Sequence, residues 1–314
     1  MEPARASFVA TVGGGQLLNQ RDVPLDGFGV LGPFVADPRV TDVFANGPGE
    51  VWVDRGDGLT REEVTLSESS LRELAVRLVS LGGRHVDEAN PLVDVQIFGG
   101  IRVHVVLPPI SPIGTLLSIR LPADTRLVIT DPRLLDLVKR RANLLLTGAG
   151  GSGKTTLLAA LLSRASHSER IVAIEDVAEL RVQHPHFISL ESRQANLEGV
   201  GEISLARLLR EALRMRPDRL VLGEVRGGEI RELLSALNTG HDGGAGTLHA
   251  NSLADVPARL EALGALAGMS DQAIARQAVS AIGAVIHLSR VDGVRSVEAI
   301  GRLGIGPDGR LVIL

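Results

Sequence analysis

The second half of the chain alternates short apolar runs with segments of helical period. Continuous apolar runs of this length suit strands that are buried on both faces of a parallel sheet, and the segments between them suit helices that cover the sheet. The pattern therefore predicts an α/β domain. The predicted strands are residues 144–147, 171–176, 219–225 and 246–250, and the predicted helices are residues 134–141, 204–215, 227–240 and two segments between 254 and 281.

The first third of the chain has a different pattern, in which short strand-like segments dominate. Strands are predicted at residues 40–47, 50–54, 59–67, 91–98, 101–109 and 115–122, with an amphipathic helix at residues 69–82. We read this part as a smaller α+β domain. The predicted organisation is a flexible extension (1–27), an N-terminal α+β domain (28–121), a linker (122–131) and a P-loop α/β domain (132–314).

The end of the chain is predicted to add strands to the edge of the sheet. Residues 284–291, 296–304 and 310–314 are strand-like, and Asp292-Gly293 and Pro307-Asp308-Gly309 mark turns between them. Tight turns join antiparallel strands, so we expect this tail to form antiparallel strands appended to the parallel sheet.

A phosphate-binding loop joins the first strand of the α/β domain to the helix that follows. The motif G-x-x-x-x-G-K-[ST] begins at Gly148 and ends with Lys154 and Thr155. Its glycines allow backbone N–H groups to turn toward an anion, Lys154 reaches the β- and γ-phosphates, and the Thr155 hydroxyl ligates Mg²⁺. The sequence therefore predicts binding of ATP with Mg²⁺. The predicted nucleotide contacts are Gly148, Gly150, Gly151, Ser152, Gly153, Lys154, Thr155 and Thr156.

The composition of the chain argues against nucleic acid as a partner and against a membrane-spanning segment. The chain has 33 Lys plus Arg, of which only Lys139 and Lys154 are lysine, and its net charge is -4. With this charge and 2% aromatic residues, the sequence offers neither a basic field nor stacking platforms for single-stranded nucleic acid. There is no cysteine and no apolar run long enough to span a bilayer, so we expect a soluble protein that reaches a membrane only through partners.

Two acidic positions follow predicted strands of the parallel sheet. Glu224 ends the run RLVLGE, which is the pattern of a Walker B strand, and it is predicted to act on the Mg²⁺ shell or on the attacking water. The alternative is a glutamate that caps the next helix. Glu175 ends the run IVAIE and is predicted to be the base that activates water, with Asp176 in support. The alternative is that both residues only cap or pair with arginines.

Histidines and arginines complete the candidate site. His241 and His249 lie in a glycine-rich segment, where they could sense the γ-phosphate or bond to the carboxylates, and a metal site is less favoured because a third ligand is lacking. Arg102 and Arg120 end strand motifs of the first domain. We predict that they close over the nucleotide, from the same subunit or a neighbouring one.

At this point the motifs resemble a known family. The segments IEDVAEL, LRMRPDRLVLGEVRGGE and NTGHDGGAGTLHANS, which follow GAGGSGKTT, closely resemble the traffic ATPases of type II and type IV secretion. The segments VTDVFANGPGEVWVDR, DEANPLVD and IRVHVVLPP are similar to the N-terminal domain of the branch that powers tight-adherence pili. The resemblance covers nearly all of residues 31–290.

The resemblance implies a RecA-like fold and a hexameric ring at the cytoplasmic face of the inner membrane. There the ring would act on an inner-membrane platform protein and use ATP hydrolysis to extend or retract a pilus or to export protein. Glu175 and Glu179 would belong to the family's Asp box, Glu224 to its Walker B motif, and His241 and His249 to its His box. Arg102 and Arg120 would reach the phosphates.

Two departures and two alternatives accompany this interpretation. Gly244, Ala245 and Gly246 replace bulkier residues of the family's His box, so we expect a looser start to that strand. Gly99 stands where an aspartate is common.

A nucleic-acid translocase built on the same ATPase core is disfavoured by the scarce aromatic residues. A nucleotide-binding scaffold with little turnover is disfavoured by the intact Lys154 and Glu224.

Overall fold

The computed structural model describes residues 6–7, 25–56, 58–97, 100–122, 127, 129–193, 201–291 and 294–314. These described residues fall into two compact units, which divide the chain into residues 1–13 with 125–314 and residues 14–124. Within the described residues, no helix is long and apolar enough to cross a membrane. Most of the predicted extension, part of the predicted linker (123–126 and 128) and Gly99 lie outside the described residues.

The smaller unit is a six-stranded antiparallel sheet with helices packed against its apolar side. The sheet order is β4-β3-β2-β7-β6-β5. Alternate residues such as Val43, Val103 and Ile119 are buried under the helix of residues Glu68–Leu81, whose first turn is capped by Ser67 Oγ. The bounds are η1 Leu25–Leu31, α1 Gly32–Ala36, β2 Asp42–Asn46, β3 Val51–Asp54, β4 Leu59–Glu62, α2 Glu68–Leu81, β5 Leu92–Ile97, β6 Ile101–Val106 and β7 Leu116–Arg120.

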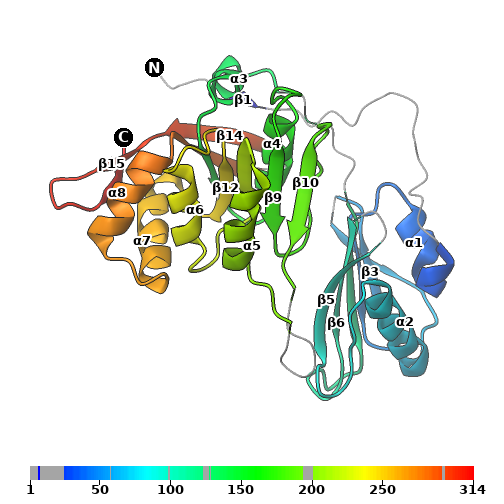
Figure 1. Cartoon of the computed structure of the whole chain (residues 1–314). Coiled ribbons are helices and arrows are strands. Elements are labelled where there is room, and N and C mark those ends of the chain that lie inside the picture. The colour runs from blue at the N-terminus through cyan, green and yellow to red at the C-terminus, as the bar shows by residue number, and fades with distance from the viewer. Residues whose placement is uncertain are drawn as a thin grey trace. The chain divides into compact units, whose positions relative to one another are not determined.

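The larger unit is a mixed eight-stranded sheet in the order β1-β14-β13-β8-β12-β11-β9-β10, covered by helices on both faces (Figure 1). Its strands are β1 Ala6–Ser7, β8 Leu144–Gly148, β9 Ile171–Glu175, β10 Phe187–Glu191, β11 Arg219–Leu222, β12 Ala245–His249, β13 Ala284–Val291 and β14 Val294–Gly301, followed by the separate hairpin β15 Leu303–Ile305 and β16 Leu311–Ile313. Its helices are α3 Pro132–Lys139, α4 Lys154–Leu162, α5 Leu205–Ala212, η3 Leu213–Met215, α6 Ile230–Leu237, η4 Leu253–Asp255, α7 Val256–Leu266 and α8 Asp271–Ala281.

Alternation along the central strand divides the core of this unit into two layers. Leu145 of β8 packs into the layer beneath α5, α6, α7 and α8. Its neighbours Leu144 and Leu146 pack into the layer beneath α3 and α4. All five residues of β8 are buried, because the strand has a parallel neighbour on each side and helices on each face.

The α/β class predicted from the apolar pattern is confirmed, but two details of the sheet differ. β13 is a core strand that pairs in parallel with β8, and only its pairing with β14 is antiparallel, so the predicted appended tail is wrong for this strand. Ala6–Ser7, in the segment predicted as a flexible extension, pairs with β14 at the edge of the sheet. Both pairings join residues that are distant in the sequence, and a local pattern does not encode them.

Candidate functional site

The loop between β8 and α4 depends on glycine at fixed positions. Gly148, Gly151 and Gly153 have φ angles of 149°, 70° and 94°, which side-chain-bearing residues rarely adopt. A Cβ on Gly148 would also lie 2.4 Å from the carbonyl oxygen of Leu288 and 2.6 Å from Ser152 Oγ. The neighbouring strand β13 therefore leaves no room for a side chain at the first position of the motif.

The amino end of α4 has the features of an anion-binding site. Among the described residues no side chain caps this helix, so the N–H groups of Lys154, Thr155 and Thr156 have no side-chain capping acceptor there. Ser152 is buried, and its hydroxyl oxygen has no hydrogen-bond partner within the described part of the chain. Orphaned donors and the positive end of a helix fit the phosphates of a nucleotide.

Lys154 is held inside the loop by two backbone carbonyls. Its Nζ donates to the carbonyl oxygens of Gly148 and Ala149, each at 2.9 Å. Burial lowers the pKa of Lys154, and the charge of Glu224 partly opposes this shift. The residue is only 7% exposed, and its ammonium group is bonded to the loop.

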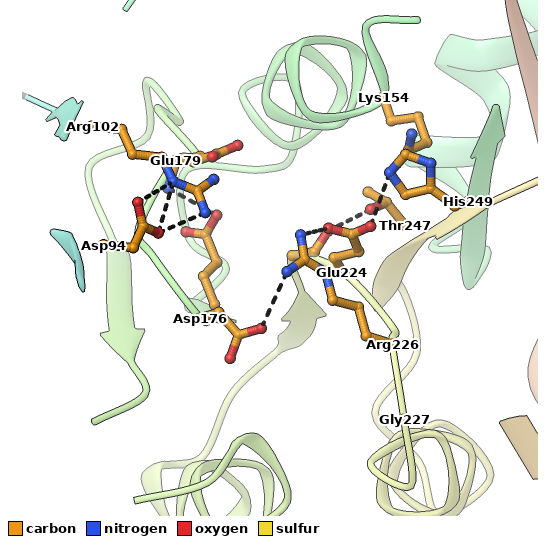
Figure 2. A network of polar contacts seen from close by, with 12 residues as sticks. Asp94, Arg102, Lys154, Asp176, Glu179, Glu224, Arg226, Gly227, Thr247 and His249 are labelled. Atoms are coloured by element: carbon orange, nitrogen blue, oxygen red, sulfur yellow. Dashed lines mark hydrogen bonds and ion pairs between the residues drawn. The ribbon is translucent and has the colours of Figure 1, made fainter. Parts of the chain in front are cut away.

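Glu224 is the centre of a polar network beside the loop (Figure 2). His249 Nε2 lies 3.1 Å from Glu224 Oε1, and Arg226 Nη2 forms a short hydrogen bond with Glu224 Oε2. Arg226 Nη1 lies 3.9 Å from Asp176 Oδ2. The network therefore joins the carboxyl ends of three neighbouring strands, since Asp176 follows β9, Glu224 follows β11 and His249 ends β12.

His249 stands between Glu224 and the phosphate loop. Its register partner on β8 is Gly148, and its Cε1 lies 3.7 Å from the position that a Cβ on Gly150 would take. Burial and the charge of Lys154 lower the pKa of His249, against the opposing effect of Glu224. The lowered pKa favours the neutral ring, and a proton on Nε2 would donate to the carboxylate, which can only accept.

Glu175 lies at the end of β9 but points back toward its own loop. Its Oε1 accepts hydrogen bonds from the backbone N–H groups of Glu179 and Leu180, each at 3.0 Å. Burial raises the pKa of Glu175 to about 7, although these hydrogen bonds act in the opposite direction. A carboxyl group with this pKa suits proton transfer near neutral pH, and its role as a base stays a prediction.

The two histidines of the glycine-rich segment do not act together. His241 lies before β12, where its Nδ1 is 3.2 Å from the carbonyl oxygen of Ala236, whereas His249 lies at the opposite end of that strand. Of the two alternatives predicted for the histidines, His241 does not form the hydrogen bond to the carboxylates within the described part of this subunit. The distance covered by the five residues of β12 is the physical reason.

The glycines before and within β12 make this region tightly packed rather than loose. A Cβ on Gly244 would lie 2.4 Å from Leu237 Cδ2 and 2.7 Å from the carbonyl oxygen of Leu220. Residues 245–249 pair in regular register with β8. The expected loosening of this strand is therefore wrong, because the neighbouring chain occupies the space that a larger side chain would take.

Arg102 and Arg120 lie side by side in the smaller unit. They are register partners on β6 and β7. Arg102 donates from Nε and Nη2 to Asp94, with a shortest distance of 2.7 Å, and Arg120 Nε lies 3.1 Å from Asp42 Oδ1. The strand pairing thus gathers both arginines on one face of that sheet. Their contact with a nucleotide stays a prediction.

Sequence reasoning missed Arg226, and the structure disfavours the alternative in which Glu224 caps the next helix. Arg226 contacts both Glu224 and Asp176. The sequence signal that could have identified it is an arginine two residues after the acid, in an extended segment. The residue that satisfies the turn before α6 is Glu229, whose Oε1 accepts from the N–H groups of Arg226 and Gly227, each at 2.7 Å. Glu224 is therefore left facing the loop network.

Magnesium fits this site as an ion that arrives with the nucleotide. Within the described residues, no group of three or more His, Cys, Asp or Glu side chains could hold a metal. Mg²⁺ usually takes one or two oxygen ligands from the protein and the others from phosphates and water. Thr155, in the first turn of α4, and Glu224 are the predicted protein ligands. The ion would supply charge neutralisation at the β- and γ-phosphates.

The fold and the site together define a RecA-like P-loop protein. The model of the type II/IV secretion system protein family matches residues 25–292, and the chain belongs to this family. A putative conjugal transfer protein of Mycobacterium tuberculosis is 47% identical over 285 residues, which cover 85% of this chain and 81% of that protein.

More distant relatives agree with this assignment. The type IV secretion system protein PtlH of Bordetella pertussis is 34% identical over 264 residues, covering 71% of this chain and 76% of that protein. The crystal structure of the pilus retraction motor PilT with bound ADP has a TM-score of 0.60 at 24% identity, covering 87% of this chain and 79% of that one. This likeness confirms the fold, and the family predicted from the motifs is confirmed by the sequence matches.

Proposed function

We propose that this chain is an ATP-hydrolysing motor of a type IV secretion or pilus machine. The observation that carries the proposal is the meeting of the phosphate loop with Glu224 and His249 at one edge of the sheet. Family membership supports the assignment to a secretion or pilus machine, since relatives bear the names of secretion and conjugal transfer proteins.

The residues divide the reaction between them. The loop and Lys154 hold the phosphates, while Thr155 and Glu224 hold Mg²⁺. Glu224 also orients the attacking water, and neutral His249 fixes the position of its carboxylate through the hydrogen bond from Nε2. Glu175 is the candidate base, and Arg102 and Arg120 stabilise the charge of the transferred phosphoryl group.

The assembly belongs to the same proposal. Six copies form a ring on the cytoplasmic face of the inner membrane, docked on a platform protein of the machine. The ring powers assembly or retraction of a tight-adherence-like pilus, or export of protein. The motif resemblance in both parts of the chain supports the tight-adherence branch, and the N-terminal arginines support sharing of the site between neighbouring subunits.

The test is phosphate release from Mg-ATP per subunit as the concentration of purified protein is raised. We expect the rate per subunit to climb and then level as rings form. Lys154→Ala, purified in parallel, gives the background from contaminating enzymes. A rate that never exceeds this background would contradict the ATPase proposal, and a rate independent of concentration would contradict a site completed between subunits.

Single-stranded DNA added to the same assay tests the nature of the cargo. We expect no stimulation, because aromatic residues are scarce and the net charge is negative. A several-fold increase of turnover with DNA would instead favour a nucleic-acid translocase on the same core.

A further inference from the structure

The hairpin of β13 and β14 places two arginines beside the phosphate loop. β13 runs parallel to β8, with Leu288 opposite Gly148, and its last residues continue past the end of β8. Arg290 on β13 and Arg295 on β14 are direct register partners. Because the carboxyl end of β13 lies at the same edge of the sheet as the loop, both residues reach the nucleotide side of the sheet.

Arg295 lies directly against the loop. Its Nε donates to the carbonyl oxygen of Gly151 at 2.9 Å, and its Cδ lies 3.1 Å from the position that a Cβ on Gly153 would take. Arg290 is nearby, with Nη1 at 3.8 Å from the corresponding Cβ position on Gly151. The two guanidinium groups thus lie against Gly151 and Gly153, whereas the Lys154 ammonium group bonds to the carbonyls of Gly148 and Ala149.

The charges of this pair are not balanced by the protein that the structure describes. Like charges on directly opposed strand positions destabilise a sheet. Neither Arg290 nor Arg295 forms an ion pair with a carboxylate of the residues that the structure describes. Burial and the charge of Arg290 lower the pKa of Arg295. An anion at this position would relieve both effects.

We propose that Arg290 and Arg295 form a second cationic contact for the phosphates of the nucleotide held by the loop. This inference rests on the proposed function and adds two binding residues to it. Arginine suits the role because its planar group donates several hydrogen bonds to phosphate oxygens. The simpler alternative is that Arg295 only braces the loop through the carbonyl of Gly151.

Substitution of Arg290 distinguishes phosphate binding from bracing of the loop. The described contacts include no hydrogen bond from its side chain to the loop, so its loss should not weaken the brace. The variants are Arg290→Ala, Arg295→Ala and the double substitution. Arg302→Ala is the matched control, since Arg302 is an exposed arginine just beyond the far end of β14. Thermal unfolding of each variant confirms that the fold is retained.

The assay measures displacement of a fluorescent ATP analogue by unlabelled ATP and by inorganic tripolyphosphate. We expect Arg290→Ala and Arg295→Ala each to raise the dissociation constants of both competitors about tenfold, as for loss of a charged hydrogen bond. The control should bind both like the native protein. Native-like binding of both competitors to Arg290→Ala would overturn the proposal. Weaker ATP binding with unchanged tripolyphosphate binding would also overturn it, because the contact would then be with the nucleoside.

The native protein distinguishes this inference from the proposed function. If it binds neither competitor, the proposed function fails and this inference fails with it. If it binds both, and the arginine variants bind them equally well, only the second cationic contact is refuted.

Discussion

The buried carboxyl group of Glu175 makes the stability of the larger unit depend on pH. Its pKa is raised from 4.5 to about 7 by burial. A group whose folded pKa is raised contributes stability that is fully present below its unfolded pKa and is lost as pH rises through the folded pKa. Raising the pKa from 4.5 to about 7 corresponds to about 3 kcal/mol, and this contribution is lost between pH 4.5 and a pH somewhat above 7.

Glu175→Gln tests this value. Glutamine cannot ionise, yet it keeps a carbonyl oxygen that can accept the N–H groups of Glu179 and Leu180. The free energy of unfolding of the variant minus that of the native protein should therefore increase by about 3 kcal/mol from about pH 4.5 to about pH 8, because only the native protein loses stability over this range.

Urea unfolding followed by circular dichroism measures this difference at several pH values. The only tryptophan, Trp52, lies on β3 of the smaller unit, so its fluorescence provides an internal control that should not change with the substitution. Glu211→Gln, at an exposed glutamate on α5, is the matched control variant. A relative stability of Glu175→Gln that stays constant within about 0.5 kcal/mol over this range would refute the reasoning about burial.

Three further predictions concern residues around the loop. Lys154→Ala should weaken ATP binding at least about tenfold in an equilibrium titration, because it removes the buried ammonium group, and native affinity would contradict its assigned role. His249→Ala should lower turnover about tenfold with ATP affinity nearly unchanged, since it removes the hydrogen bond to Glu224, and an unchanged rate would exclude this positioning role. Gly223→Ala should lower the free energy of unfolding by about 1–3 kcal/mol in urea, because the new Cβ would lie 2.6 Å from Glu175 Cγ; native stability would show that the side chain moves freely.

The phosphate loop was predictable because its chemistry is local. The glycines, Lys154 and Thr155 are consecutive in the sequence, and the strand and helix on either side follow from apolar pattern alone. Glu224 was predictable for a similar reason, because an acid that follows an apolar strand lies at the carboxyl edge of a parallel sheet.

The order of the strands in the sheet was not predictable from the sequence. β12 lies between β8 and β11, which brings His249 next to Glu224 and leaves His241 at the other edge. β13 lies on the other side of β8, and this placement brings Arg290 to the loop. Such neighbours are fixed by packing between distant segments, for which the sequence carries no local signal.

The direction in which a side chain points at the end of a strand was also not predictable from the sequence. Glu175 and Asp176 are adjacent, and alternation predicts that they face opposite ways without saying which faces the network. In the structure Glu175 bonds to the backbone of its own loop, while Asp176 lies near Arg226. The buried backbone N–H groups of the loop need an acceptor, and the nearest carboxylate satisfies them.

Glu224→Gln tests the central claim, that this site hydrolyses ATP, most directly. Glutamine nearly preserves the size of the side chain but removes the negative charge that orients water and Mg²⁺. ATP binding and phosphate release are measured on the same purified variant. The account predicts ATP affinity within a few-fold of native and turnover lower by at least about 100-fold. Turnover at the native rate in Glu224→Gln would contradict the account.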